Sequence, residues 1–166
     1  MTFAPRTWLV GEVATAAMFN TEVRDQFASM FDAWTSWTPS WTAATTNPVV
    51  GNGTLNGRHM KWGRTCHVNL ELTCGSTTTY GSGVWSFSLP FTAAAAVGSR
   101  VGIAHALAGS NRVAGNIIVS ASATTFTPFF PASTSVSFLS NGGAANPFTW
   151  ASGNQLRCSF TFETAT

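Results

Sequence analysis

The chain has 166 residues and a mass of 17.5 kDa, enough for one ordinary domain with an appendage. Charged residues make up only 8% of the sequence, whereas about a quarter is usual in soluble domains, and aromatic residues reach 13%. So few charges favour a chain that buries part of its surface in an assembly. No run of about 18 apolar residues occurs, so a membrane span is not expected.

The few charges are unevenly distributed. Residues 1–34 hold two arginines and four acidic residues, a balance of −2, whereas residues 35–166 hold six basic and two acidic residues, a balance of +4. This mild basicity lacks the clustered positive stripe of a nucleic-acid-binding protein. The apolar start is interrupted by Pro5, Arg6 and Glu12, and three cysteines cannot form a closed disulfide framework. We therefore expect synthesis in a reducing cytoplasm without export, and neither nucleic acid nor a membrane as partner.

One amphipathic helix is predicted over residues 14–34. Thr15 stands at the N-cap position, where its hydroxyl can accept a free amide hydrogen of the first turn. Apolar side chains then recur every three or four residues and form one stripe: Ala16, Phe19, Val23, Phe27, Met30 and Trp34. A helix this short is unstable alone in water. We therefore expect the stripe to pack on its own β-domain, in a trimeric bundle, or in a larger assembly.

Strands are predicted for the rest of the chain. Residues 35–46 contain Pro39 and no helical period, so they are predicted to form an extended connector. Within residues 47–166, apolar and polar residues alternate strictly over 66–74 and 155–163, which indicates half-buried antiparallel strands. Further strands are expected at 55–62, 85–89, 100–108, 113–120, 125–130 and 135–139. Such short strands predict a mainly β fold, with the N-terminal helix followed by an antiparallel β-sandwich or jelly-roll-like domain.

Candidate metal-ligating residues lie on strands. Cys66, Cys74 and Cys158 fall on the apolar phase of their strands, where we expect them to be small buried side chains. Cys66 and His67 are adjacent on a strand and so point to opposite faces, which excludes a shared metal ion. His105 has the same phase as the apolar residues around it, so we expect it to point inward or into a subunit contact.

Enzymatic activity is not expected. The β-domain contains no aspartate and two glutamates, Glu71 and Glu163, so it offers one pair of carboxylates for glycoside hydrolysis. Two solvated strand charges are the simpler interpretation. No nucleophile elbow, P-loop or dinucleotide motif occurs. We predict no catalytic residue, no metal and no cofactor.

Tyr80 is the one tyrosine, in a glycine-rich turn at residues 75–83. An exposed aromatic ring between glycines can stack on a sugar ring, whereas most loop aromatics cover an edge of the core. Tyr80 is therefore a candidate glycan contact.

The N-terminal sequence resembles a known segment. Residues 7–27 (TWLVGEVATAAMFNTEVRDQF) are similar to the N-terminal segment of minor tail and tail-fibre proteins of phages that infect actinobacteria and related hosts. The recurring positions correspond here to Trp8, Gly11, Glu12, Thr15, Ala16, Ala17, Asn20, Val23, Arg24 and Asp25. Residues 47–58, 75–90 and 151–157 resemble the β-domain that often follows.

The resemblance implies a structural virion protein: a short tail fibre, or a tail-tip or baseplate appendage. Residues 1–34 would anchor it to other phage structural proteins, and the β-domain would project as a homotrimer. The residues expected in anchoring or trimerisation are Trp8, Phe19, Val23, Phe27, Met30 and Trp34. Two alternatives are a dedicated adhesin for a cell-wall polysaccharide, which the balance of +4 favours slightly if the polymer is anionic, and a capsid-decorating head fibre.

Overall fold

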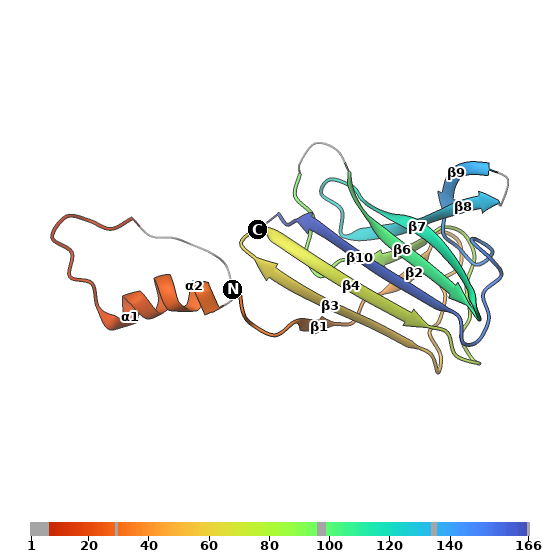
Figure 1. Cartoon of the computed structure of the whole chain (residues 1–166), viewed down its shortest axis with the longest axis horizontal. Helices are drawn as coiled ribbons and strands as arrows, with labels where there is room; N and C mark the ends of the chain where they lie inside the picture. Colours follow the sequence, from red (N-terminus) through yellow and green to blue (C-terminus); the bar gives the residue numbers. More distant parts are fainter. Residues whose placement is uncertain (1–6, 29, 96–98, 134–135, 166) are drawn as a thin grey trace.

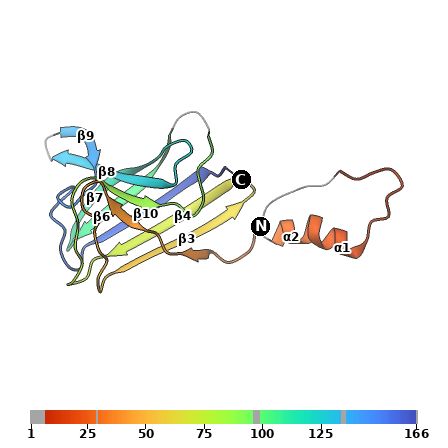
Figure 2. The same cartoon turned by 180° about the vertical axis from the view of Figure 1, so that it is seen from behind.

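The computed structural model describes residues 7–28, 30–95, 99–133 and 136–165. Figure 1 shows a β-domain with a helical N-terminal segment (residues 7–34) on one side, and Figure 2 shows the same arrangement from behind. The fold is mainly antiparallel β with an N-terminal helix, as predicted. Within the described ranges, ten strands form one curled sheet.

The helix begins where the sequence predicts and ends earlier. α1 (Ala16–Phe19), the π-helical turn η1 (Asn20–Arg24) and α2 (Asp25–Ala28) follow one another directly. The hydroxyl of Thr15 accepts a hydrogen bond from the Met18 N–H at 3.2 Å, which confirms the predicted N-cap.

The predicted extension of the helix to residue 34 is wrong. The N–H groups of Met30 and Phe31 donate to carbonyls three residues back, of Phe27 and Ala28, so the chain turns there. Trp34 lies outside the helix, and its ring packs edge-on against His67 at a centroid distance of 5.3 Å. It is therefore not part of the helical stripe.

All eight predicted strands are present, together with two that were not predicted. The strands are β1 (Thr35–Trp37), β2 (Trp41–Ala43), β3 (Thr54–Trp62), β4 (Thr65–Thr73), β5 (Trp85–Ser88), β6 (Arg100–Ala108), β7 (Asn111–Val119), β8 (Thr125–Ser133), β9 (Val136–Asn141) and β10 (Gln155–Glu163). Their order is β1-β3-β4-β10-β6-β7-β8-β5-β2, and β9 pairs with β8. Every pair is antiparallel.

The two additional strands lie in residues 35–46, the segment predicted to be a connector. β1 and β2 occupy opposite ends of the strand order, although only residues 38–40 separate them in the chain. The curled sheet therefore brings its two edges close together, in a sandwich-like arrangement. Phe126 of β8 packs on Phe160 of β10 across the interior, at a centroid distance of 4.7 Å.

The core contains the residues that strand alternation placed there. Apolar residues of the predicted strands 66–74, 85–89 and 155–163 are buried: Cys66, Val68, Leu70, Leu72, Trp85, Phe87, Phe160 and Phe162. Trp85 packs edge-on against Trp41 at 4.8 Å. Burial raises the pKa of the Cys66 thiol to about 12, so this cysteine stays protonated near neutral pH and serves as a packing residue.

β6 has the opposite orientation from the predicted one. Ala104 and Ala106 are fully buried, whereas Val101 and Ile103 are 66% and 67% exposed. The small residues face inward because β6 lies against the aromatic side chains of β10: a Cβ at Gly102 would come within 2.2 Å of the Phe160 Cβ. His105 therefore lies on the outward face and not in the core, so the first of its two predicted positions is wrong and a subunit contact stays a prediction.

Candidate functional site

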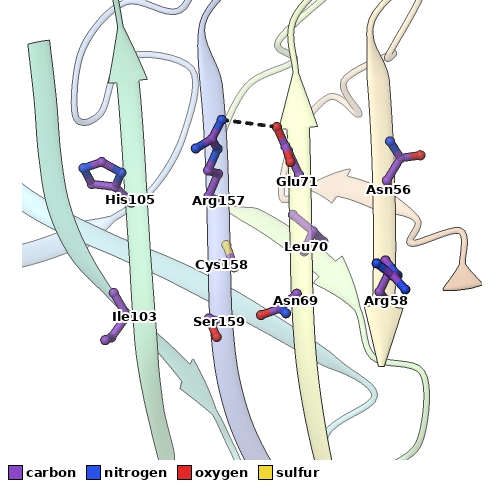
Figure 3. Close-up of a pocket in the computed structure, with 10 residues that line it drawn as sticks. All are labelled: Asn56, Arg58, Asn69, Leu70, Glu71, Ile103, His105, Arg157, Cys158 and Ser159. Atoms are coloured by element: carbon purple, nitrogen blue, oxygen red, sulfur yellow. Dashed lines mark ion pairs between the residues drawn. The ribbon is translucent and has the colours of Figure 1, made fainter. Parts of the chain in front are cut away.

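The outward face of β3, β4, β10 and β6, here called the outer face, contains an open hollow of about 580 Å³. Its lining comes from all four strands, and Figure 3 shows these residues side by side on the sheet. They are Asn56, Arg58, Asn69, Leu70, Glu71, Ile103, His105, Arg157, Cys158 and Ser159. We call this the outer-face hollow.

Strand register places the polar side chains of the outer-face hollow in rows. Arg157 of β10 lies between Glu71 of β4 and His105 of β6. Ser159, two residues further along β10, lies in the same way between Asn69 and Ile103. Because side chains two residues apart on a strand share a face, both rows point to the same side of the sheet.

The charges in the outer-face hollow are partly compensated. The Arg157 Nη2 atom lies 3.5 Å from Glu71 Oε1 and donates a hydrogen bond to Gln155 Oε1 at 2.8 Å. Arg58 is exposed, and neither it nor His105 forms a hydrogen bond or ion pair with other residues in the described ranges. With a neutral histidine the hollow therefore carries one net positive charge.

The two carboxylates of the β-domain lie far apart on the outer face. Glu71 is opposite Arg157, and Glu163 is six residues further along β10, which corresponds to about 20 Å at roughly 3.3 Å per residue. Each has an arginine partner, since Arg64 Nη2 lies 3.2 Å from Glu163 Oε1. A glycosidase holds its two carboxyl groups within roughly 10 Å, so these two do not form such a pair.

Three loops meet at the end of the β-domain that lies away from the N-terminal segment (Figures 1 and 2). Asn52 Oδ1 accepts a hydrogen bond from the Thr77 N–H at 2.9 Å, and the Asn52 N–H donates to Thr77 Oγ1 at 2.8 Å. The Gly153 N–H donates to the Cys74 carbonyl at 2.8 Å. Asn52, Thr77 and Gly153 lie in the three segments that resemble phage β-domains. These segments therefore include residues whose hydrogen bonds hold the loops together at this end of the domain.

Tyr80 lies in one of these loops and is half-buried against the core. Its carbonyl accepts a hydrogen bond from Trp85 Nε1 at 3.0 Å. Burial raises the pKa of Tyr80, and a side-chain hydrogen bond with Cys74 raises it further. Tyr80 therefore fastens this loop to the core, and its role as a glycan contact stays a prediction.

Residues 9–12 of the N-terminal segment form a turn, which is stabilised by residues of the motif. The Glu12 N–H donates to the Leu9 carbonyl at 3.1 Å, and the Leu9 N–H donates to Glu12 Oε2 at 3.1 Å. Gly11 adopts φ +83°, a left-handed conformation that glycine accepts without strain. The turn brings the Trp8 ring to 5.9 Å from Phe19. The motif thus folds back onto its own helix.

The apolar stripe of the helix is exposed, so it does not pack on its own β-domain. Phe19, Val23, Phe27 and Met30 are between 41% and 62% exposed. Leu9, Val10 and Val13, which precede the helix, are exposed as well. Six residues are predicted to take part in anchoring or trimerisation. Of these, Trp8 and Phe19 contact each other, and the Trp34 ring packs against His67 of β4. Their role in anchoring stays a prediction.

Neither a membrane span nor a metal site is found in the described residues. No helix among them is long and apolar enough to cross a bilayer. They also hold no group of three or more His, Cys, Asp or Glu side chains placed to bind a metal ion.

Comparisons with known proteins give an informative match. No protein-family model matches the chain, and no solved structure matches it. The chain is similar to the Mu-like prophage FluMu defective tail fiber protein of Haemophilus influenzae, with 30% identity over 135 residues. The match covers 70% of this chain and 18% of that protein, so the chain spans less than a fifth of its relative.

Proposed function

We propose that the protein is a structural component of a phage tail: a short fibre, or a tail-tip or baseplate appendage, made in the host cytoplasm and assembled into the virion. The observation that carries the proposal is the similarity to a tail fiber protein over 70% of the chain. The relative comes from Haemophilus influenzae, so the expected kinship with phages of actinobacteria rests on the resemblance of the N-terminal motif and of the three β-domain segments.

The N-terminal segment is the proposed anchor to other phage structural proteins. Its apolar side chains are exposed to water and so contribute little to stability. Burying each large one in a partner would contribute roughly 1.5–3 kcal/mol. The β-domain, in contrast, has its own core, in which Trp85, Phe87 and Phe126 are fully buried. The β-domain has a core of its own, whereas the apolar stripe of the helix is exposed. This difference supports a role for the helix as the anchor and for the β-domain as the projecting part.

We also propose that the protein is a homotrimer. Three copies of the helical stripe, packed together, would remove Phe19, Val23 and Phe27 from water. A helix this short does not associate strongly alone, but association of the β-domains would hold three helices at high local concentration.

A second candidate function is that of an adhesin for a cell-wall polysaccharide. The outer-face hollow favours it, because its polar side chains point away from the core toward solvent. The two functions are compatible, since a tail appendage can also attach to the host surface. Catalysis is not part of either proposal, because Glu71 and Glu163 are separated and each is paired with an arginine.

Mass spectrometry of phage particles separated into heads and tails tests the proposed function. We expect peptides of this chain in the tail fraction and not in the head fraction. Peptides in the head fraction would favour a capsid-decorating head fibre instead. Absence from both fractions would exclude a structural role in the particle.

A further inference from the structure

We propose that the outer-face hollow binds an anionic polysaccharide, one whose units bear carboxylate or phosphate groups. This inference rests on the proposed role in host attachment and names its site and ligand class. The hollow is where the outer face presents cationic groups, amides and a hydroxyl together.

The first argument is the availability of hydrogen-bond donors on the cations. Arg58 forms no ion pair with any residue that the structure describes, and its side chain is exposed. Arg157 uses Nη2 for both Glu71 and Gln155, so its Nε and Nη1 donors are left for a ligand. Guanidinium groups recognise carboxylates and phosphates through paired N–H donors, which suits both arginines to an anionic group.

The second argument is the spacing of the two arginines. Arg58 is on β3 and Arg157 on β10, two strands apart and displaced by two residues along the strands. At about 4.8 Å between strands and 3.4 Å per residue, their Cα atoms are roughly 12 Å apart. At this spacing each arginine can contact its own phosphate or carboxylate on neighbouring units of a polymer.

The third argument is the character of the surface between the arginines. Asn56, Asn69 and Ser159 line this part of the hollow and offer both donors and acceptors. Ile103 contributes an exposed apolar patch beside Ser159. Amides, a hydroxyl and a small apolar surface suit the hydroxyls and C–H groups of a sugar. The lining includes no Phe, Tyr or Trp side chain, so recognition here would rest mainly on polar contacts.

The position of the outer-face hollow agrees with this role. Its residues extend from the middle of β3, β4, β10 and β6 toward the strand ends that lie farther from the N-terminal segment (Figure 1). A protein that is held by its N-terminal segment would present this half of the domain outward.

The test is titration of the full chain with three polymers by isothermal calorimetry. The probes are polygalacturonate, which carries carboxylates, poly(glycerol phosphate), which carries phosphates, and neutral dextran. We expect binding to at least one anionic polymer, weakening as NaCl is raised, and no binding to dextran. Which anionic polymer binds more tightly identifies the anionic group. Failure to bind either anionic polymer, or equal binding to dextran, would overturn the proposal.

Two matched variants locate the site. Arg58→Gln removes a charge inside the hollow, whereas Arg112→Gln removes the same charge from the same face of the sheet, opposite Leu107 and outside the hollow. We expect Arg58→Gln to lower the affinity roughly tenfold, as loss of a charged hydrogen bond does, and Arg112→Gln to change it less than about twofold. Equal losses in the two variants would show that net charge, not this hollow, binds the polymer.

A second substitution, Asn69→Asp, places a negative charge between the arginines. We expect it to weaken polymer binding at least as much as Arg58→Gln does, with thermal stability monitored to verify folding. Unchanged affinity would contradict the site. Because this experiment uses purified protein, its failure leaves the proposed tail location intact, and that location fails independently if the chain is absent from tails.

Discussion

Arg157 on β10 reaches across to Glu71 on β4, with its Nη2 atom 3.5 Å from the glutamate Oε1. The two residues lie directly opposite each other in the antiparallel register, although 85 positions separate them in the chain. The contact has two consequences. It holds one of the two β-domain carboxylates beside an arginine, and it sets the charge of the outer-face hollow, where Arg58 carries the uncompensated charge.

Glu71→Gln is expected to leave the fold intact and to strengthen polyanion binding. Both side chains of the pair are about half exposed, and exposed ion pairs contribute at most about 1 kcal/mol to stability. Removing the carboxylate frees Arg157 and raises the net charge of the hollow by one. Thermal melts and polygalacturonate titrations check this. Weaker binding in the variant would indicate that Glu71 itself contacts the ligand.

Trp85→Ala is expected to destabilise the β-domain by roughly 3–5 kcal/mol, the usual cost of removing a fully buried aromatic side chain. Trp85 is completely buried, contacts Trp41 and Trp150, and donates a hydrogen bond to the Tyr80 carbonyl. Urea denaturation measures the change. Trp62→Ala is the matched control, because Trp62 is 42% exposed, and it should change stability much less. Similar losses in both variants would contradict the placement of the core.

His59 is expected to make the protein less stable as the pH falls. It is buried between Trp37 and Phe91, and no hydrogen bond to its Nδ1 atom is found among the described residues. Burial lowers the pKa of His59 below its ordinary value of 6.5. Between these two pKa values the unfolded chain binds more protons than the folded one, so the free energy of unfolding decreases as the pH falls through about 6.5.

Melting temperatures of the wild type and His59→Gln between pH 8 and pH 5 measure this effect. The glutamine cannot take up a proton, so the variant should lose less stability than the wild type on acidification. Parallel curves would show that the buried histidine does not contribute to the pH dependence.

Eight strands could be predicted from sequence, whereas β1 and β2 could not. β4 and β10 have one buried and one solvated face, which gives a strict alternation over nine residues. β1 and β2 have three residues each, too few for a period, and they form because β3 and β5 provide hydrogen-bond partners.

The inward position expected for His105 is wrong because the larger apolar residues of β6, with which it shares a face, are the exposed ones. Ala104 and Ala106 face the core beside Cys158 and Leu156 of β10, and both are fully buried. For the outer-face hollow, alternation correctly placed Asn69, Glu71 and Arg157 on outward faces. That they meet there depends on the pairing of β4 with β10, a contact between distant segments that no local pattern reveals.

The 166-residue chain is expected to form a homotrimer in solution, with three times its mass of 17.5 kDa. The exposed stripe of Phe19, Val23 and Phe27 is too apolar for a free monomer. Light scattering at micromolar concentration measures the mass. A monomer mass would exclude the trimer.

Incorporation of helix variants into phage particles tests the central claim, that the N-terminal helix anchors the protein. The test variant combines Val23→Asp with Phe27→Asp, and the matched control combines Val101→Asp with Phe138→Asp, two exposed apolar residues of the β-domain. Both variants should fold, since the β-domain has its own core. We predict that the control appears in purified particles at the wild-type level and that the helix variant is absent. Normal incorporation of the helix variant would contradict anchoring by this helix.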